Sequence, residues 1–106
     1  MVIVVVTFRL PQPATSAQMA DVFRSTAPKY VGVAGLLKKH YWLSEDGLRA
    51  GGIYLWVARA DAERLYTDEW KERVSAKYGA RPEIAYLSSP VSVNNSTGVV
   101  ETHQAL

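Results

Sequence analysis

The chain has 106 residues, of which 48% are hydrophobic and 21% charged, so it corresponds to one small globular domain. Twelve Lys and Arg residues against ten Asp and Glu give a net charge of only +2, and the basic residues are scattered. This pattern does not favour a nucleic-acid partner. The absence of cysteine excludes disulfides, thiol catalysis and thiolate metal sites.

The first predicted element is a strand from Val2 to Leu10, which is rich in β-branched residues and stops at Pro11 and Pro13. No basic segment precedes this apolar run, and it is too short to cross a bilayer. We therefore expect a cytoplasmic protein with no membrane partner.

The second element is a helix that begins near Thr15, because Thr15 and Gln18 form the pattern of a capping box. Pro28 would clash with the carbonyl group of Arg24, so the helix is expected to kink or restart near Pro28.

A hairpin follows, with strands at Leu36–Leu43 and Ile53–Val57 and turn-forming residues at 44–47. The pair Gly51-Gly52 predicts either a β-bulge or a close approach of another group to the backbone.

The last part of the domain is a divided helix and a strand. Asp61 is the expected N-cap, Thr67 is expected to cap a second segment, and Gly79 follows the helix end. Glu69 and Arg73 have the spacing of a helix-surface ion pair. The final strand is expected at 82–93, which gives a domain at 1–93 and a tail without clear periodicity at 94–106.

This order, β-α-β-β-α-β, predicts an α+β fold of the ferredoxin-like type, with a four-stranded antiparallel sheet and two helices on one face. The first strand is apolar on both faces, because Val2, Val4 and Val6 alternate with Ile3, Val5 and Thr7. Since two helices can cover only one face, a second copy of the chain is expected on the other, as a homodimer.

Aromatic residues predict a binding site. In simple register, Lys38, His40 and Trp42 would lie beside Gly52, Tyr54 and Trp56 on one face, whereas a bulge at the glycine pair would change this. Tyr66 and Trp70 are four residues apart on the following helix. Such a cluster can bind a flat aromatic ligand, although the same side chains can also serve as core.

His40 is the predicted proton-transfer residue of this cluster, because imidazole titrates near neutral pH. With only two histidines and no carboxylate at a helical offset from His40, no metal site is expected. No glycine-rich phosphate loop follows a strand, so no nucleotide cofactor is expected.

Several segments together resemble the YdhR-like family of mono-oxygenases, over nearly the whole chain up to Val93. The segments that carry the resemblance are Ala27-Pro28-Lys29-Tyr30, Gly35 to Gly47, Ala50-Gly51-Gly52-Ile53-Tyr54-Leu55-Trp56, Tyr66-Thr67-Asp68-Glu69-Trp70 and Lys77-Tyr78-Gly79-Ala80. This family is similar to the dimeric α+β barrel superfamily, which includes the antibiotic-biosynthesis monooxygenases.

The resemblance implies a homodimeric monooxygenase that oxidises an aromatic phenol or quinol with molecular oxygen and no cofactor. His40 and Tyr54 would be catalytic, His40 as the base, while Tyr66 would help to orient the substrate. Trp42, Trp56 and Trp70 would form the walls of the site. Two alternatives remain open: a non-enzymatic protein that binds an aromatic metabolite, and a haem-handling protein.

Overall fold

The computed structural model of the chain describes residues 1–103. Its elements in chain order are β1 (Val2–Arg9), α1 (Ser16–Thr26), the 3-10 helix η1 (Ala27–Tyr30), β2 (Leu36–Leu43), β3 (Arg49–Trp56), α2 (Arg59–Leu65), α3 (Asp68–Tyr78), β4 (Glu83–Ser88), β5 (Val91–Asn94) and β6 (Val99–Thr102). Within the described residues, no helix is long and apolar enough to cross a membrane.

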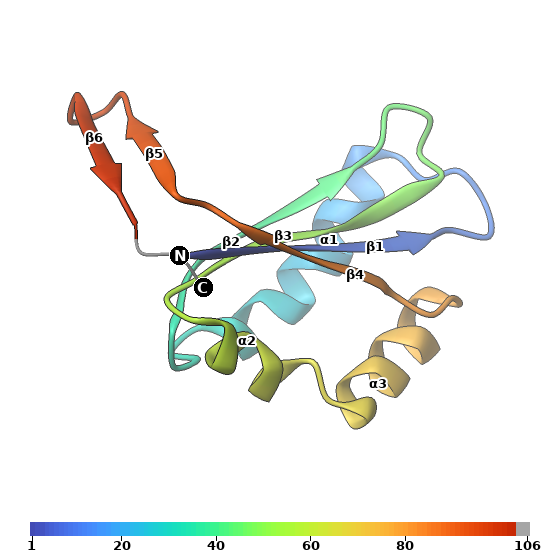
Figure 1. Cartoon of the computed structure of the whole chain (residues 1–106). Helices are drawn as coiled ribbons and strands as arrows, with labels where there is room; N and C mark the ends of the chain where they lie inside the picture. Colours follow the sequence, from blue (N-terminus) through green and yellow to red (C-terminus); the bar gives the residue numbers. More distant parts are fainter. Residues whose placement is uncertain (104–106) are drawn as a thin grey trace.

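The predicted α+β, ferredoxin-like architecture is confirmed. An antiparallel four-stranded sheet has the order β2-β3-β1-β4, and α2 and α3 lie below it in Figure 1. Alternate residues of β1 are buried: Val2, Val4, Val6 and Phe8 face the helices and belong to the hydrophobic core. We call this helix-covered side the inner face of the sheet, and the opposite side the outer face.

The start and end of α1 follow the sequence prediction. The Thr15 hydroxyl accepts a hydrogen bond from the Gln18 amide, and the Gln18 side chain accepts one from the Thr15 amide, which completes the capping box. The α-helix ends at Thr26, and the chain continues as η1 with Pro28 in its first turn. Proline fits that position because the first amides of a helix have no helical acceptor.

The second helical region is divided, as predicted, but it begins earlier. Ala58 is the N-cap of α2, so the assignment of Asp61 as N-cap is wrong. Asp61 lies in the first turn, where its carboxylate interacts favourably with the positive end of the helix dipole. Thr67 caps α3 by accepting from the Trp70 amide, and Gly79 ends α3 at φ 78°, a conformation that glycine adopts without strain.

The end of the chain is more ordered than the sequence suggested. Strand β4 ends at Ser88 instead of Val93, and a separate hairpin, β5–β6, occupies part of the expected tail. Figure 1 shows this hairpin projecting at upper left, away from α2 and α3. The His103 imidazole Nε2 lies 2.8 Å from the Ser92 hydroxyl and joins the two ends of the hairpin. Residues 104–106 of the expected tail lie outside the described part of the chain.

The turn between β2 and β3 sets which residues share a face. The Ser44 amide donates to the Arg49 carbonyl over 2.8 Å, which leaves residues 45–48 as the loop. An even-numbered loop pairs odd residues with even ones, so Lys39 lies opposite Tyr54 and His40 opposite Ile53. The irregularity in this pairing falls between Leu36 and Lys38, not at Gly51-Gly52.

Candidate functional site

A cavity of about 270 Å³ lies between the inner face of the sheet and the helices, and we call it the inner cavity. Its volume is close to the lower end of the roughly 300–1,000 Å³ that is typical of small-molecule pockets. The lining residues come from β1, α1, η1, β2, β3, α2 and α3: Phe8, Thr26, Lys29, Tyr30, Lys39, Tyr41, Gly51, Gly52, Tyr54, Leu65, Trp70, Arg73, Val74, Lys77 and Tyr78.

The most unusual group in the inner cavity is the amine of Lys39. Its Nζ atom lies 3.4 Å from the ring centroid of Tyr30, 3.9 Å from that of Tyr41 and 4.6 Å from that of Tyr54. Among residues 1–103, no carboxylate forms a salt bridge with it. Three aromatic faces and no anion make an apolar surrounding for an amine.

Burial of Lys39 has a direct chemical consequence. Desolvation lowers its pKa from 10.5 to about 7, because the ammonium form loses water that nothing charged replaces. The faces of the three tyrosine rings attract a cation and oppose part of this loss. An amine with a pKa near neutrality can accept a proton from a bound molecule and return it.

The glycine pair of β3 makes room on both faces of the sheet. A Cβ atom on Gly52 would lie 2.9 Å from Tyr54 Cε1 and 3.1 Å from Lys39 Cε, which is closer than side chains normally pack. A Cβ atom on Gly51 would overlap the Val6 carbonyl oxygen and lie 3.1 Å from Trp42 Cζ2. Of the two predicted explanations for this pair, close approach is therefore the correct one, and Gly52 gives the Lys39 amine its place.

Four of the six predicted site residues form one aromatic cluster on the inner face. Tyr54 and Trp70 line the cavity and are 2% and 3% exposed, while Trp56 and Tyr66 are buried behind them and do not line it. The Tyr66 ring packs edge-on against the rings of Tyr54 and Trp70, with centroid distances of 5.4 Å and 5.0 Å.

Hydrogen bonds satisfy the polar ends of this cluster. The Trp56 indole N–H donates to the Tyr66 hydroxyl over 3.1 Å, and the Trp70 indole N–H donates to the Tyr30 hydroxyl over 3.2 Å. Burial raises the pKa values of Tyr54 and Tyr66 far above the usual value for a phenol. These two hydroxyls therefore remain protonated and can act only as neutral hydrogen-bonding groups.

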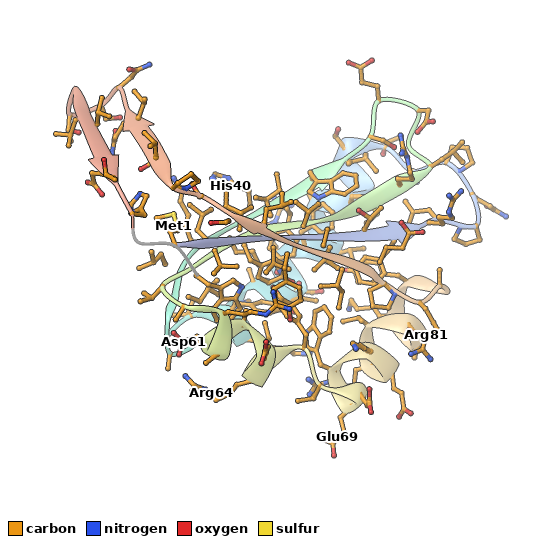
Figure 2. The ribbon with its side chains drawn as sticks, viewed as in Figure 1. Met1, His40, Asp61, Arg64, Glu69 and Arg81 are labelled. Atoms are coloured by element: carbon orange, nitrogen blue, oxygen red, sulfur yellow. The ribbon has the colours of Figure 1, made fainter. Side chains whose placement is uncertain are left out.

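The prediction that His40 and Trp42 share a face with Tyr54 and Trp56 is wrong. His40 pairs with Ile53 and Trp42 with Gly51, so both side chains belong to the outer face and neither lines the inner cavity. Figure 2 shows His40 above the sheet, on the side away from Asp61, Arg64 and Glu69. His40 is exposed to solvent, whereas the Trp42 indole N–H is buried and has no hydrogen-bond partner among residues 1–103.

Sequence reasoning assigned Tyr54 to the site but gave no role to Lys39 itself or to Tyr30 and Tyr41, the other two tyrosines around its amine. Lys39 and Tyr41 alternate along β2 with His40 and Trp42. The one-residue error in strand register that placed His40 on the inner face therefore placed Lys39 and Tyr41 on the outer face. The Tyr41 hydroxyl is held 2.8 Å from the Thr26 hydroxyl, which ties β2 to the end of α1. The sequence feature that could have identified Lys39 and Tyr41 is the four-residue loop between β2 and β3. Its even length fixes which residues of β2 share a face with Tyr54.

Solved structures with the same fold include those of two Streptomyces proteins. One is a monooxygenase from the gene ActVA-Orf6 of Streptomyces coelicolor in complex with the ligand nanaomycin D; it has a TM-score of 0.61 and 17% identity, and the match covers 88% of this chain and 90% of that one. The other is SnoaB, a cofactor-independent oxygenase from Streptomyces nogalater, with a TM-score of 0.60, 18% identity, and coverage of 83% and 91%.

These similarities establish a shared fold at low sequence identity. No protein-family model and no curated protein matches the chain. Fold alone does not determine a reaction, so any function has to be argued from the inner cavity and its residues.

Proposed function

We propose that the protein is a monooxygenase that oxidises a planar aromatic phenol, quinol or anthrone in the inner cavity, with molecular oxygen and no cofactor. The observation that carries the proposal is the Lys39 amine, buried against three tyrosine rings at a pKa of about 7. The shared fold with a monooxygenase and a cofactor-independent oxygenase supports it. Membership of the YdhR-like family and a cytoplasmic location remain predictions from the sequence.

The proposed reaction is balanced without an added reductant. A ring methylene and one O₂ become a carbonyl and one water: carbon loses four electrons, O₂ gains them, and the two hydrogens leave in the water. Neutral Lys39 takes the first methylene proton, and the resulting carbanion, stabilised by the aromatic system, reduces O₂ and forms a C–O bond to give a peroxide that the ammonium protonates. Lys39 then takes the second methylene proton as the O–O bond breaks, which leaves the carbonyl, and it returns that proton to the departing hydroxide to give water.

The proposed roles of the other residues follow from their places. Tyr54 and Trp70 border the ligand, and Tyr54 offers a neutral hydroxyl that can donate to a developing oxyanion. Trp56 and Tyr66 hold these rings from behind. His40 and Trp42, which lie on the outer face, take no part in this mechanism.

Oxygen uptake tests the proposal. The purified protein, treated with a chelator, is mixed with a panel of anthrones, hydroquinones and polycyclic phenols. We expect uptake above the rate without protein, with one O₂ consumed per carbonyl formed and no oxygen released by added catalase. Binding of panel members by calorimetry without uptake would favour the alternative, a binding protein for aromatic metabolites.

We also propose that the outer face is covered by a second copy of the chain. Ile53 and Leu87 on this face are 36% and 48% exposed, and Val93 and Val100 of the projecting hairpin are 66% and 65% exposed. Apolar area of this kind on one side of a sheet favours association. Light scattering at micromolar concentration should give a dimer mass, and Ile53→Lys should reduce it to that of a monomer.

A further inference from the structure

The inner cavity has an uncompensated positive charge. Lys29, Lys39, Arg73 and Lys77 line it, and among the residues that the structure describes no Asp or Glu does. Lys29, Arg73 and Lys77 are exposed, while Lys39 is largely buried. The cavity thus has a basic, solvent-facing mouth formed by η1 and α3, and an aromatic interior.

The side chains at this mouth have no anionic partner within residues 1–103. The salt bridges among residues 1–103 join other side chains: Arg9–Glu83, Arg24–Asp21, Arg59–Glu63 and Arg64–Asp61. The predicted pair between Glu69 and Arg73 is not among them, so that prediction is wrong. The Lys77 ammonium donates to a neutral group, the Ser25 hydroxyl, over 3.5 Å. A ligand can therefore supply the missing negative charge.

We infer that the inner cavity takes an aromatic carboxylate, with its rings beside Tyr54 and Trp70 and its carboxylate at the mouth beside Arg73 and Lys77. The inference rests on the proposed function for the choice of site and adds the substrate class. A guanidinium presents paired N–H groups that match the two oxygens of a carboxylate. The volume of about 270 Å³ favours a ligand of two or three fused rings.

The position of Lys39 decides which end of the ligand enters first. A carboxylate beside the amine would stabilise the ammonium form and remove the base that the proposed reaction needs. A carboxylate held at the exposed mouth stays partly hydrated, at a much lower desolvation cost than in the interior. The interior then receives the uncharged rings and the carbon atom to be oxidised.

Calorimetric titration with three matched probes tests the inference without any turnover. The probes are 2-naphthoate, the neutral 2-naphthamide and 2-naphthyl phosphate. We expect 2-naphthoate to bind at least tenfold more tightly than 2-naphthamide, and Arg73→Gln and Lys77→Gln each to remove most of that preference. Lys71→Gln, which removes the same charge from α3 at a residue that does not line the cavity, should change it less than twofold.

Several results would overturn the inference: equal affinity for the acid and the amide, no measurable binding of 2-naphthoate at millimolar concentration, or an equal loss in Lys71→Gln. Tighter binding of the phosphate than the carboxylate would also overturn it, by assigning the mouth to a phosphate ester. Because these measurements need no oxygen, they are separate from the proposed function. Oxygen uptake from neutral substrates together with no preference for the acid would remove the substrate class and leave the oxygenase in place.

Discussion

The two faces of strand β2 carry similar chemical groups in opposite surroundings. On the inner face, the Lys39 amine is buried against tyrosine rings; on the outer face, the His40 imidazole is exposed to solvent. By residue type alone the histidine is the better candidate for proton transfer at neutral pH. Burial reverses this order, because it moves the lysine pKa to about 7 and places the amine in the inner cavity.

The largest expected effect separates these two residues kinetically. Lys39→Met keeps most of the side-chain volume and removes the amine, so we expect oxygen uptake to fall by about 10²- to 10⁴-fold, the usual contribution of a general base. In the wild type, kcat/KM should rise with pH around an apparent pKa of about 7, as Lys39 becomes neutral.

The matched controls for this variant are neighbours on the same strand. Lys38→Met removes an identical group from the outer face, and His40→Ala removes the imidazole. Both should retain uptake within about twofold. Loss of activity in His40→Ala with full activity in Lys39→Met would reverse the comparison and return the chemistry to the outer face.

The pH dependence of stability tests the burial of Lys39 independently of activity. The pKa is about 7 in the folded protein against 10.5 for the unfolded chain, so between these values the unfolded state binds more protons and stability rises with pH. Below pH 7 the ammonium is buried at full cost, and Lys39→Met should be more stable than the wild type by at most about 5 kcal/mol.

Urea unfolding from pH 6 to 9.5, followed by tryptophan fluorescence, measures this difference. The range stops below pH 10, where the raised pKa values of the buried tyrosines begin to act in the opposite direction. The advantage of Lys39→Met should be nearly constant below pH 7 and shrink steadily as the pH rises above 7. A constant difference across the range would mean that Lys39 has an ordinary pKa and is solvated.

The glycine pair of β3 allows the inner and outer faces of the sheet to be compared within one strand. Gly51→Ala would press against the backbone carbonyl of Val6 and should destabilise the fold by about 3 kcal/mol or more. Gly52→Ala meets only side chains, Tyr54 and Lys39, and should cost about 1 kcal/mol while displacing the amine. Gly52→Ala is therefore expected to fold stably but to lose oxygen uptake, because the Lys39 amine is displaced. Similar losses of stability in Gly51→Ala and Gly52→Ala would contradict the assigned contacts.

The smallest expected effect concerns the support of Tyr41 on the inner face. Thr26→Val keeps the shape of the buried side chain but removes its hydrogen bond with the Tyr41 hydroxyl, and should cost about 1 kcal/mol. His40→Ala removes a side chain that is exposed in the single chain, and should change the free energy of unfolding of the monomer by less than about 0.5 kcal/mol. Thermal unfolding of the two variants side by side would check this difference.

Local signals in the sequence were sufficient for most of the fold. The capping box at Thr15, the cap at Thr67 and the glycine at 79 depend on contacts within a few residues, and the structure confirms all three. The alternation in β1 placed Val2, Val4 and Val6 on one face and Ile3, Val5 and Thr7 on the other, and the structure showed which of the two faces the helices bury. The start of α2 and the β5–β6 hairpin were missed, because Ala58 makes no side-chain cap and the hairpin depends on long-range pairing.

The sequence by itself determined the order of the elements up to β4, the caps of α1 and α3, and the membership of Tyr54, Trp56, Tyr66 and Trp70 in an aromatic cluster. Only the tertiary structure decided which face of β2 meets that cluster. Alternating residues in a strand point to opposite faces, so a register error of one residue exchanges Lys39 with His40. The stretch Leu-Leu-Lys-Lys-His-Tyr-Trp-Leu has no regular alternation of polar and apolar residues that would fix this register, so the length of the loop and the packing against Gly52 did so. The lowered pKa of Lys39 has the same origin, because it results from burial beside Tyr41 of its own strand and beside Tyr30 and Tyr54, which come from other elements.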